Sequence, residues 1–288
     1  MARAWDMTVR ELLRQGIQDL RDAQVQSPVL DAEVLLAHVL ERSRTVLLAT
    51  FDEQVSALMQ REYREFVHRR VRREPVAYLV GDKEFYGRAF RVTPAVLIPR
   101  PETEILLERA LEITGSDGMA VDVGTGSGCI AISFALERPG WKVYATDTSA
   151  DALGIAGQNI EAFRAAGRVR LLHGSLLEPV DSQVGLVMAN LPYVPTGEIP
   201  RLDADVRAWE PHCALDGGPD GMGSIRSLLE QLPAKLRPDG VCLLELDPRL
   251  FDALDRAVAR HMSDWQVLRH RDLTGRERVA ELRGFTPS

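Results

Sequence analysis

The second half of the chain, from residue 119 onward, alternates between short apolar runs and longer stretches of helical periodicity. Short apolar runs bounded by turn residues are typical of buried strands. The predicted strands are 120–123, 142–146, 169–173, 184–189, 241–246, 265–269 and 279–282. The predicted helices are 129–137, 151–165, 223–236 and 249–261. This alternation is typical of βαβ units, so it predicts an α/β domain built on a parallel, doubly wound sheet.

The first 75 residues predict helices only. Apolar residues recur at helical spacing in 8–23, 27–40 and 44–49, and then in a long fourth helix for which Asp52 is the expected N-cap. Pro75 stops helical continuation, because proline lacks the N–H that a helix interior requires. No group of residues in this stretch looks catalytic. We therefore expect a small all-helical domain that serves as a recognition or cap domain rather than as an active site.

Residues 78–93 are predicted to connect the two halves. The stretch 85–92 is typical of a short hairpin with Gly87 near its turn. In the following stretch 98–104, prolines on both sides hold Arg100 in an extended or turn geometry. This segment is either a rigid loop or a loop that closes over a ligand. A helix is expected to resume over 102–113.

Composition excludes several classes of protein. The 288 residues are 45% hydrophobic and 27% charged, as in ordinary globular proteins, and the net charge of -7 argues against a general nucleic-acid binder. No apolar run reaches membrane-spanning length, and residues 1–10 lack the apolar core of a signal peptide. The three cysteines and six histidines are scattered without metal-ligand spacing. We expect a cytoplasmic protein with no metal site, no membrane partner and no stable nucleic-acid partner.

A strongly basic run, 68–73, closes the predicted fourth helix. Cations are favoured at a helix C-terminus by the helix dipole, so a solvated helix end is the simpler interpretation. The functional alternative is a contact for RNA or for an acidic partner surface.

A glycine loop lies between the first predicted strand of the sheet and the helix after it. Gly124, Gly126 and Gly128 alternate with other residues, which lets the backbone turn tightly and lets a ligand approach it closely. Asp147 ends the next strand, 23 residues after Gly124, at a spacing typical of an acid that holds ribose hydroxyls. Both a dinucleotide and S-adenosylmethionine fit this pattern. The Gly-x-Gly-x-Gly spacing, preceded by Asp122, favours S-adenosylmethionine.

The tetrapeptide Asn190-Leu191-Pro192-Tyr193 follows the predicted strand 184–189. Asn190 offers a side-chain carbonyl, Leu191 a backbone carbonyl restricted by Pro192, and Tyr193 a flat aromatic face. Two acceptors beside an aromatic plane form a socket for a planar NH2 group. Alone, the tetrapeptide is an ordinary turn. In open α/β sheets, however, ligands bind at the carboxyl ends of strands, and the longest non-periodic stretch, 192–221, begins inside this socket.

Taken together, these motifs resemble the HemK/PrmC-type protein glutamine methyltransferases, which modify the Gly-Gly-Gln glutamine of peptide chain release factors. The resemblance covers nearly the whole chain. The segments that carry it are 73–78, 85–87, 97–104, 122–128, 190–193, 210–211, 217–221 and 272–278.

The resemblance implies a helical release-factor-recognition domain over 1–75, a hairpin hinge over 76–95, and a Rossmann-like S-adenosylmethionine-dependent methyltransferase domain over 96–288. It implies that S-adenosyl-L-methionine is the cofactor and that release factors are the partners. The implied cofactor-binding residues are Gly124, Thr125, Gly126, Ser127, Gly128, Asp147, Ser175, Leu176 and Asn190. The implied substrate-binding and catalytic residues are Asn190, Leu191, Pro192 and Tyr193, with Arg100 as a further substrate contact.

Three positions depart from the family pattern. Leu191 stands where the family has the first proline of Asn-Pro-Pro-Tyr, which keeps the backbone acceptor but loses rigidity. An aromatic residue is common in the family near Leu176. The stretch 244–247 lacks the glycine expected after the fifth strand.

The mechanistic hypothesis starts from the weak nucleophilicity of an amide nitrogen, whose lone pair is delocalised into the carbonyl. Asn190 and Leu191 carbonyls accept the two N–H bonds of the substrate, Tyr193 stacks on the amide plane, and positioning supplies most of the rate. Alternatives remain: an adenine-N6 methyltransferase acting on RNA or DNA, a ribosomal-protein glutamine methyltransferase, or a release-factor-binding protein with a vestigial cofactor pocket.

Overall fold

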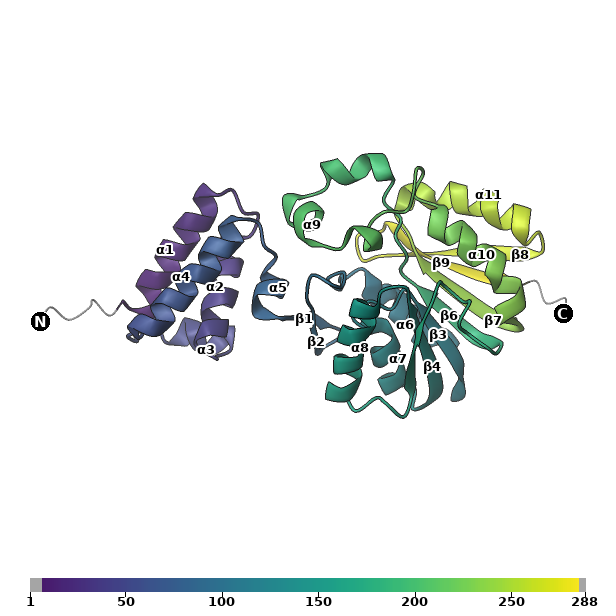
Figure 1. The fold of residues 1–288 in the computed structure, drawn as a ribbon, viewed down its shortest axis with the longest axis horizontal. Coiled ribbons are helices and arrows are strands. Elements are labelled where there is room, and N and C mark those ends of the chain that lie inside the picture. The colour runs from purple at the N-terminus through teal and green to yellow at the C-terminus, as the bar shows by residue number, and fades with distance from the viewer. Residues whose placement is uncertain (1–6, 285–288) are drawn as a thin grey trace, which may run out of the picture. The chain divides into compact units, whose positions relative to one another are not determined.

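The computed structural model describes residues 7–284. Residues 1–6 and 285–288, at the outer ends of the two predicted domains, lie outside the described residues, as does most of the segment considered as a signal peptide. The described chain forms two compact units (Figure 1). The first runs to Gly81 and also takes in Asp203–Trp209. The second comprises Asp82–Leu202 and the residues from Glu210 onward.

The first unit is helical, as its sequence predicts. Its helices are α1 (Val9–Asp22), α2 (Pro28–Val39), α3 (Arg44–Ala49), α4 (Ala57–Val71), α5 (Val76–Val80) and α9 (Ala204–Trp209). The Thr8 hydroxyl accepts a hydrogen bond from the Glu11 N–H while the Glu11 carboxylate accepts one from the Thr8 N–H, which is a capping box. The N-cap of α4 is Ser56, so the expectation that Asp52 caps this helix was wrong. Residues just after Asp52 instead bond to the start of the chain, where Val55 N–H donates to the Met7 carbonyl at 2.9 Å.

The helical unit extends beyond Pro75, where the sequence predicted its end. Pro75 is the N-cap of the short helix α5, which Gly81 ends in a left-handed conformation at φ 85°. Proline suits a helix start because its missing N–H would be unpaired there in any case. The buried side chains of Tyr78 and Leu79 account for the extra turn.

The basic run 68–73 is only partly a solvated helix end. Arg70 is 5% exposed, and its guanidinium pairs with Asp31 at 2.7 Å and with Asp205 at 2.6 Å, inside the helical unit. Arg69 pairs with Glu74, and Arg73 donates to the Ala23 carbonyl at 2.8 Å. These three arginines therefore hold the helical unit together. In particular, Arg70 joins α2 and α4 to α9, which arrives from a distant part of the sequence.

The second unit begins with the predicted hairpin, formed by β1 (Asp82–Phe85) and β2 (Arg88–Arg91). Tyr86 and Gly87 at its turn both have positive φ, 51° and 69°, as a tight two-residue hairpin requires. Phe85 and Phe90 are fully buried, and Asn159 exchanges two hydrogen bonds with the Arg91 backbone. The hairpin is thus part of the core of the second unit.

All seven predicted strands of the sheet form. They are β3 (Asp117–Val123), β4 (Gly140–Asp147), β5 (Val169–His173), β6 (Val184–Ala189), β7 (Leu236–Glu245), β8 (Trp265–Arg271) and β9 (Glu277–Gly284). Their order in the sheet is β5-β4-β3-β6-β7-β9-β8. The helices of this unit are α6 (Thr103–Ile113), α7 (Cys129–Glu137), α8 (Ala150–Ala162), α10 (Gly223–Lys235) and α11 (Phe251–His261). Short 3-10 turns follow β6 and β7, at Thr196–Arg201, His212–Ala214 and Pro248–Leu250.

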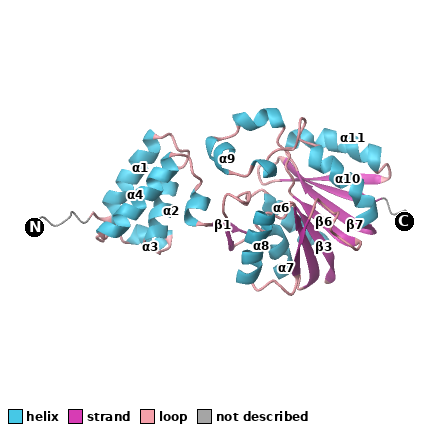
Figure 2. Cartoon of the chain, in the orientation of Figure 1, coloured by secondary structure: helices cyan, strands magenta, loops and turns pink. Residues whose placement is uncertain are grey.

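Helices cover both faces of the sheet (Figure 2). Alternate residues of a strand point to opposite faces, and here they enter two separate cores. Val121 and Val187 pack with α10 and α11, whereas Ala120 and Leu186 pack with α6, α7 and α8. Burial on both faces explains why these strands are continuously apolar. Across residues 7–284, no helix has the length and apolar character needed to cross a membrane.

The expectation of a wholly parallel sheet was wrong for one strand. The first five strands are mutually parallel, but β9 runs antiparallel to both β7 and β8. The chain passes from β8 to β9 through a short turn over 272–276, and a turn of this length can join only antiparallel strands. Asp272 builds the turn by accepting the N–H groups of Thr274 and Arg276, both at 2.9 Å.

Candidate active site

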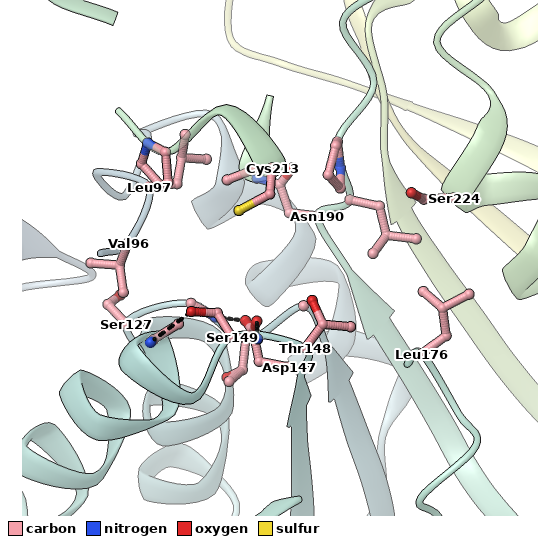
Figure 3. A pocket seen from close by; sticks show the side chains of 18 of the residues that line it. Val96, Leu97, Ser127, Asp147, Thr148, Ser149, Leu176, Asn190, Cys213 and Ser224 are labelled. Carbon is pink, nitrogen blue, oxygen red and sulfur yellow. Dashed lines mark hydrogen bonds between the residues drawn. The ribbon is translucent and has the colours of Figure 1, made fainter. Parts of the chain in front are cut away.

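The candidate site lies at the carboxyl edge of the sheet, where strand order reverses beside β3. The chain leaves β3 toward β4 and β5, and later returns through β6 on the other side. Loops after β3 and β6 therefore diverge, which is where open α/β sheets bind ligands. A cavity of about 560 Å³ opens there, a volume usual for small-molecule sites. Figure 3 shows side chains from several of these loops around one common space.

The glycine loop forms one wall of the cavity. Gly124, Gly126 and Gly128 all adopt positive φ, at 72°, 55° and 80°. A Cβ built on Gly126 meets no heavy atom of the described residues within 4 Å beyond its chain neighbours, so this glycine faces open space. A Cβ on Gly128 meets Ile132 at 3.1 Å and Ala156 at 3.3 Å. Gly126 thus leaves room for a ligand, whereas Gly128 allows helix packing and is absent from the cavity wall among the described residues.

Asp147 ends β4 and faces the glycine loop, as its spacing predicts. Its Oδ2 accepts the Gly126 N–H and its Oδ1 accepts the Ser149 N–H, both at 2.9 Å. These bonds fix the carboxylate at the cavity wall, where oxygen lone pairs remain for further donors. The arrangement suits a ligand that carries hydroxyl groups.

The other predicted cofactor residues also reach the cavity. Thr125, Ser127, Ser175 and Leu176 line it together with Asn190. Leu176 follows β5 in a left-handed conformation at φ 51°. The wall also includes residues that no sequence motif predicted, among them Ala95 and Val96, Thr148 and Ser149 just before α8, the exposed Cys213, and Ser224 and Ser227 of α10.

Three of the four residues of the predicted socket lie at the cavity, and the fourth, Tyr193, does not. Asn190, Leu191 and Pro192 line the cavity, with Asn190 directly after β6 (Figure 3). Tyr193 is missing from that wall among the described residues, and its ring packs against the hydrophobic core. Burial raises the pKa of the Tyr193 phenol, and the nearby Glu245 carboxylate adds to this shift. In this conformation the ring does not offer its face to the cavity.

Leu191 contributes more than its backbone carbonyl. Its side chain is 5% exposed and belongs to the core of the sheet face that α10 and α11 cover. Its Cδ2 lies 3.3 Å from a Cβ built on Gly124, so the leucine packs directly on the glycine loop. The residue that replaces the family's proline therefore connects the socket to the cofactor loop by van der Waals contact.

Arg100 reaches the cavity, but its charge is already paired. Its guanidinium forms an ion pair with Glu210, which is 6% exposed and also accepts the Ile98 N–H at 3.3 Å. Glu210 thereby ties the segment before α6 to the long loop after β6. Arg100 lines the cavity, with Glu210 setting its position, and its role as a substrate contact stays a prediction.

The long loop 192–221 folds back on the socket and is held there by backbone hydrogen bonds. The Val194 N–H donates to the Leu215 carbonyl at 3.0 Å, and the Gly217 N–H donates to the Val194 carbonyl at 2.8 Å. A Cβ on Gly217 would lie 2.8 Å from the Pro192 carbonyl oxygen, so only glycine allows this crossing. The glycines at 217–221 therefore support the residues that follow Asn190.

Two buried carboxyl groups lie beneath the cavity. Asp122 and Glu245 are 0% and 3% exposed, and burial raises the pKa of each to about 7. Asp122 accepts the Thr125 hydroxyl at 2.6 Å and so supports the glycine loop. Glu245 lies beside Asn190 and Thr103. An acidic residue inside an apolar strand costs free energy unless it is hydrogen-bonded, and that pattern was the signal available in the sequence for Glu245.

The described residues contain no side-chain cluster suited to binding a metal ion. Over residues 7–284, no cluster of three or more histidine, cysteine, aspartate or glutamate side chains is arranged to hold a metal ion. The cavity wall carries the fixed carboxylate of Asp147 together with Asn190 and Leu191, whose carbonyl groups are acceptors. Such a wall can bind a ligand with hydroxyl groups and can orient an NH2 group beside it.

Both halves of the chain match known families. The family model described as PrmC N-terminal domain matches residues 11–81, and that described as Methyltransferase small domain matches residues 101–201. A release factor glutamine methyltransferase from Moorella thermoacetica is 41% identical over 278 residues, covering 94% of this chain and 97% of that protein. One from Koribacter versatilis is 38% identical over 277 residues, covering 95% and 97%.

Among solved structures, the chain is similar in fold to a ribosomal protein L11 methylase from Lactobacillus delbrueckii subsp. bulgaricus. The TM-score is 0.51 at 22% identity, and the match covers 70% of this chain and 89% of that chain. A likeness at this identity shows the fold alone.

Proposed function

Because the chain belongs to the release factor glutamine methyltransferase family, we propose that it methylates release factors on the glutamine of their Gly-Gly-Gln motif. The methyl group passes from S-adenosylmethionine to the side-chain amide nitrogen. One observation supports this most: the glycine loop, Asp147 and Asn190 face a single cavity. These elements come from three different strands, so their convergence is not a consequence of sequence proximity.

The cavity wall fits the cofactor. Gly126 leaves open space beside its backbone, and Asp147 holds a fixed carboxylate with free acceptor capacity for ribose hydroxyls. Ser175 and Leu176 form the wall after β5, where the adenine would lie. When bound, the cofactor supplies an electrophilic methyl group on a sulfonium centre. The protein's part is to hold that group in line with the acceptor nitrogen.

On the substrate side, Asn190 Oδ1 and the Leu191 carbonyl accept the two N–H bonds of the glutamine amide. Bonds to both hydrogens favour a tetrahedral nitrogen whose lone pair points at the methyl group. The bound cofactor would supply its methyl group to this nitrogen, which would then release one proton to water. Because a positively charged amide nitrogen is strongly acidic, no dedicated base is needed. Tyr193 would have to turn out of the core to stack on the amide.

The helical unit is assigned to recognition of the release factor. Within residues 7–284, eight large hydrophobic side chains are exposed, and six of them lie in this unit. They are Val29, Leu30, Val46, Leu48, Leu58 and Met59. Exposed apolar side chains gathered in one unit are typical of a protein-binding surface. A cytoplasmic setting follows from this substrate.

Transfer of a labelled methyl group tests the proposal against its alternatives. The purified protein is incubated with labelled S-adenosylmethionine and, separately, with a release factor, ribosomal protein and RNA. Label is expected on the release factor alone, and a Gly-Gly-Glu variant of that factor should remain unlabelled. Label on RNA would instead identify an adenine methyltransferase, and label on ribosomal protein would change the substrate. No transfer to any of them would indicate a vestigial pocket.

A further inference from the structure

The orientation of the Asn190 side chain decides what the cavity offers. An asparagine amide presents an acceptor oxygen on one side and a donor NH2 on the other. Turned one way, it accepts an N–H of the substrate amide; turned the other way, it presents its own N–H groups to that amide and repels it. Something in the protein must therefore fix the amide in one orientation.

The first contact that does so is Thr103, at the start of α6. Its hydroxyl oxygen accepts a hydrogen bond from Asn190 Nδ2 at 3.0 Å. Thr103 is 3% exposed, so water does not compete freely for this bond. A hydroxyl can also donate, however, and a donating Thr103 would bond the Asn190 oxygen equally well. The threonine alone leaves the orientation undecided.

The second contact is Glu245, the last residue of β7. Ala189 and Leu244 are partners in the β6–β7 register, so the residues that follow them, Asn190 and Glu245, emerge side by side. Burial raises the pKa of Glu245, and hydrogen bonding from Thr103 and, more weakly, from Asn190 opposes that rise, so both groups face its carboxyl group. Its Oε2 lacks a hydrogen-bond partner among the described residues, so acceptor capacity remains. In its ionised form Glu245 can only accept, which commits the Thr103 proton to Glu245 and leaves the threonine oxygen as an acceptor.

We propose that Thr103 and Glu245 are positioning residues that fix the Asn190 amide with Nδ2 turned into the protein and Oδ1 turned to the cavity. The hydrogen bonds then run in one direction, from the Asn190 amide to the Thr103 hydroxyl and on to the Glu245 carboxylate. This inference rests on the proposed function, because it assigns the free Oδ1 to the substrate amide. Thr103 lines the cavity and Glu245 is absent from its wall among the described residues, and in this proposal both act through Asn190.

Thr103 offers a matched pair of variants. Thr103→Val keeps the shape of the side chain and removes the hydroxyl, whereas Thr103→Ser keeps the hydroxyl and removes a methyl group. With full-length protein, Thr103→Val is expected to lower kcat on a release factor by about 10- to 100-fold, in the range of a lost preorganised contact. Affinity for S-adenosylmethionine and KM for the factor should stay within twofold. Thr103→Ser should recover most of the rate.

Glu245→Gln is a second variant of nearly unchanged shape. Because a glutamine amide both donates and accepts, the direction of the hydrogen bonds is lost, and kcat should fall with cofactor affinity retained. A spectroscopic readout needs no substrate. In a ¹⁵N-labelled protein, the Asn190 side-chain NH2 signals, assigned by their loss in Asn190→Ala, should exchange slowly with water. They should exchange faster in Thr103→Val and Glu245→Gln.

The outcomes separate this inference from the proposed function. Fast exchange of the Asn190 NH2 in the wild type, or a Thr103→Val rate equal to wild type, overturns the positioning role. Equal losses of rate in Thr103→Val and Thr103→Ser, together with a lowered melting temperature, also overturn it, since packing would then be responsible. If the wild type labels no release factor while its Asn190 NH2 is protected and the variants lose that protection, the proposed function fails and the positioning role stands.

Discussion

At the scale of single residues, Asn190 is the side chain on which the chemistry depends. Asn190→Ala removes one of two substrate acceptors and leaves the glycine loop and Asp147 in place. Losing a preorganised hydrogen-bonding group of this kind typically costs on the order of a hundredfold in turnover. Single-turnover rates on a release factor, normalised to folded protein, provide the measurement. If the tetrapeptide were only a turn, stability would change and the rate per folded molecule would not.

The backbone carbonyl and the buried side chain of Leu191 have different roles, and one substitution can separate them. Leu191→Pro retains the carbonyl, so turnover per folded molecule should stay within a few-fold of wild type. The side chain, however, is buried against Gly124, and shortening it leaves unfilled space in the core. Losing part of a buried leucine typically costs about 1–3 kcal/mol, which urea unfolding would detect. A large loss of turnover at unchanged stability would contradict this division.

At the scale of elements, the glycine loop offers a matched pair of substitutions. Gly126→Ala and Gly128→Ala both place a Cβ on a left-handed backbone, so the conformational strain is similar, about 1 kcal/mol. Only at Gly126 is the added methyl group directed into open space, and only at Gly128 does it meet Ile132 and Ala156. Calorimetry should show weakened S-adenosylmethionine binding for Gly126→Ala. Thermal unfolding should show the larger loss of stability for Gly128→Ala.

For Gly126, a branched side chain sharpens the same test. Gly126→Val should abolish cofactor binding while the circular dichroism spectrum and the cooperativity of unfolding are retained. Unchanged affinity in this variant would remove the loop from the cofactor site.

Elements with a strong hydrophobic period could be predicted from the sequence. Elements whose position depends on contacts between distant residues could not. The seven strands and the glycine loop follow from apolar runs and glycine spacing, which are local. The direction of β9 depends on a turn built by Asp272, and α9 joins the helical unit through Arg70, whose partners are distant in sequence. Asn190 was predicted from its place after a strand. Thr103 and Glu245 were not, because their importance comes from meeting Asn190 in space.

At the scale of the whole molecule, the buried carboxyl groups make stability depend on pH. Burial raises the pKa of Glu245 from 4.5 to about 7, against weaker opposing effects of Thr103 and Arg278. Between those values the folded state binds more protons than the unfolded state, so this group makes stability fall as pH rises. Glu245→Gln removes the dependence. The unfolding free energy of the variant relative to wild type should therefore increase between pH 5 and pH 8, by up to about 3 kcal/mol. Asp122 titrates in both proteins and cancels from the difference; identical pH slopes would rule out the effect.

We propose that the helical unit recognises the release factor and that the second unit carries out methyl transfer. The exposed apolar side chains of α4 allow a test of these separate roles. Leu58 and Met59 are 66% and 36% exposed, and Leu58→Ser with Met59→Ser removes apolar surface without opening the core. If this surface binds the release factor, KM for the intact factor should rise several-fold. Rates on a short Gly-Gly-Gln peptide and affinity for S-adenosylmethionine should be unchanged, since the cavity belongs to the other unit. Leu268→Ser, at 41% exposure on β8, is the control for a general loss of surface hydrophobicity. An equal rise in KM for factor and peptide would show that the substitutions affect the catalytic unit. It would contradict the proposal that the helical unit binds the release factor.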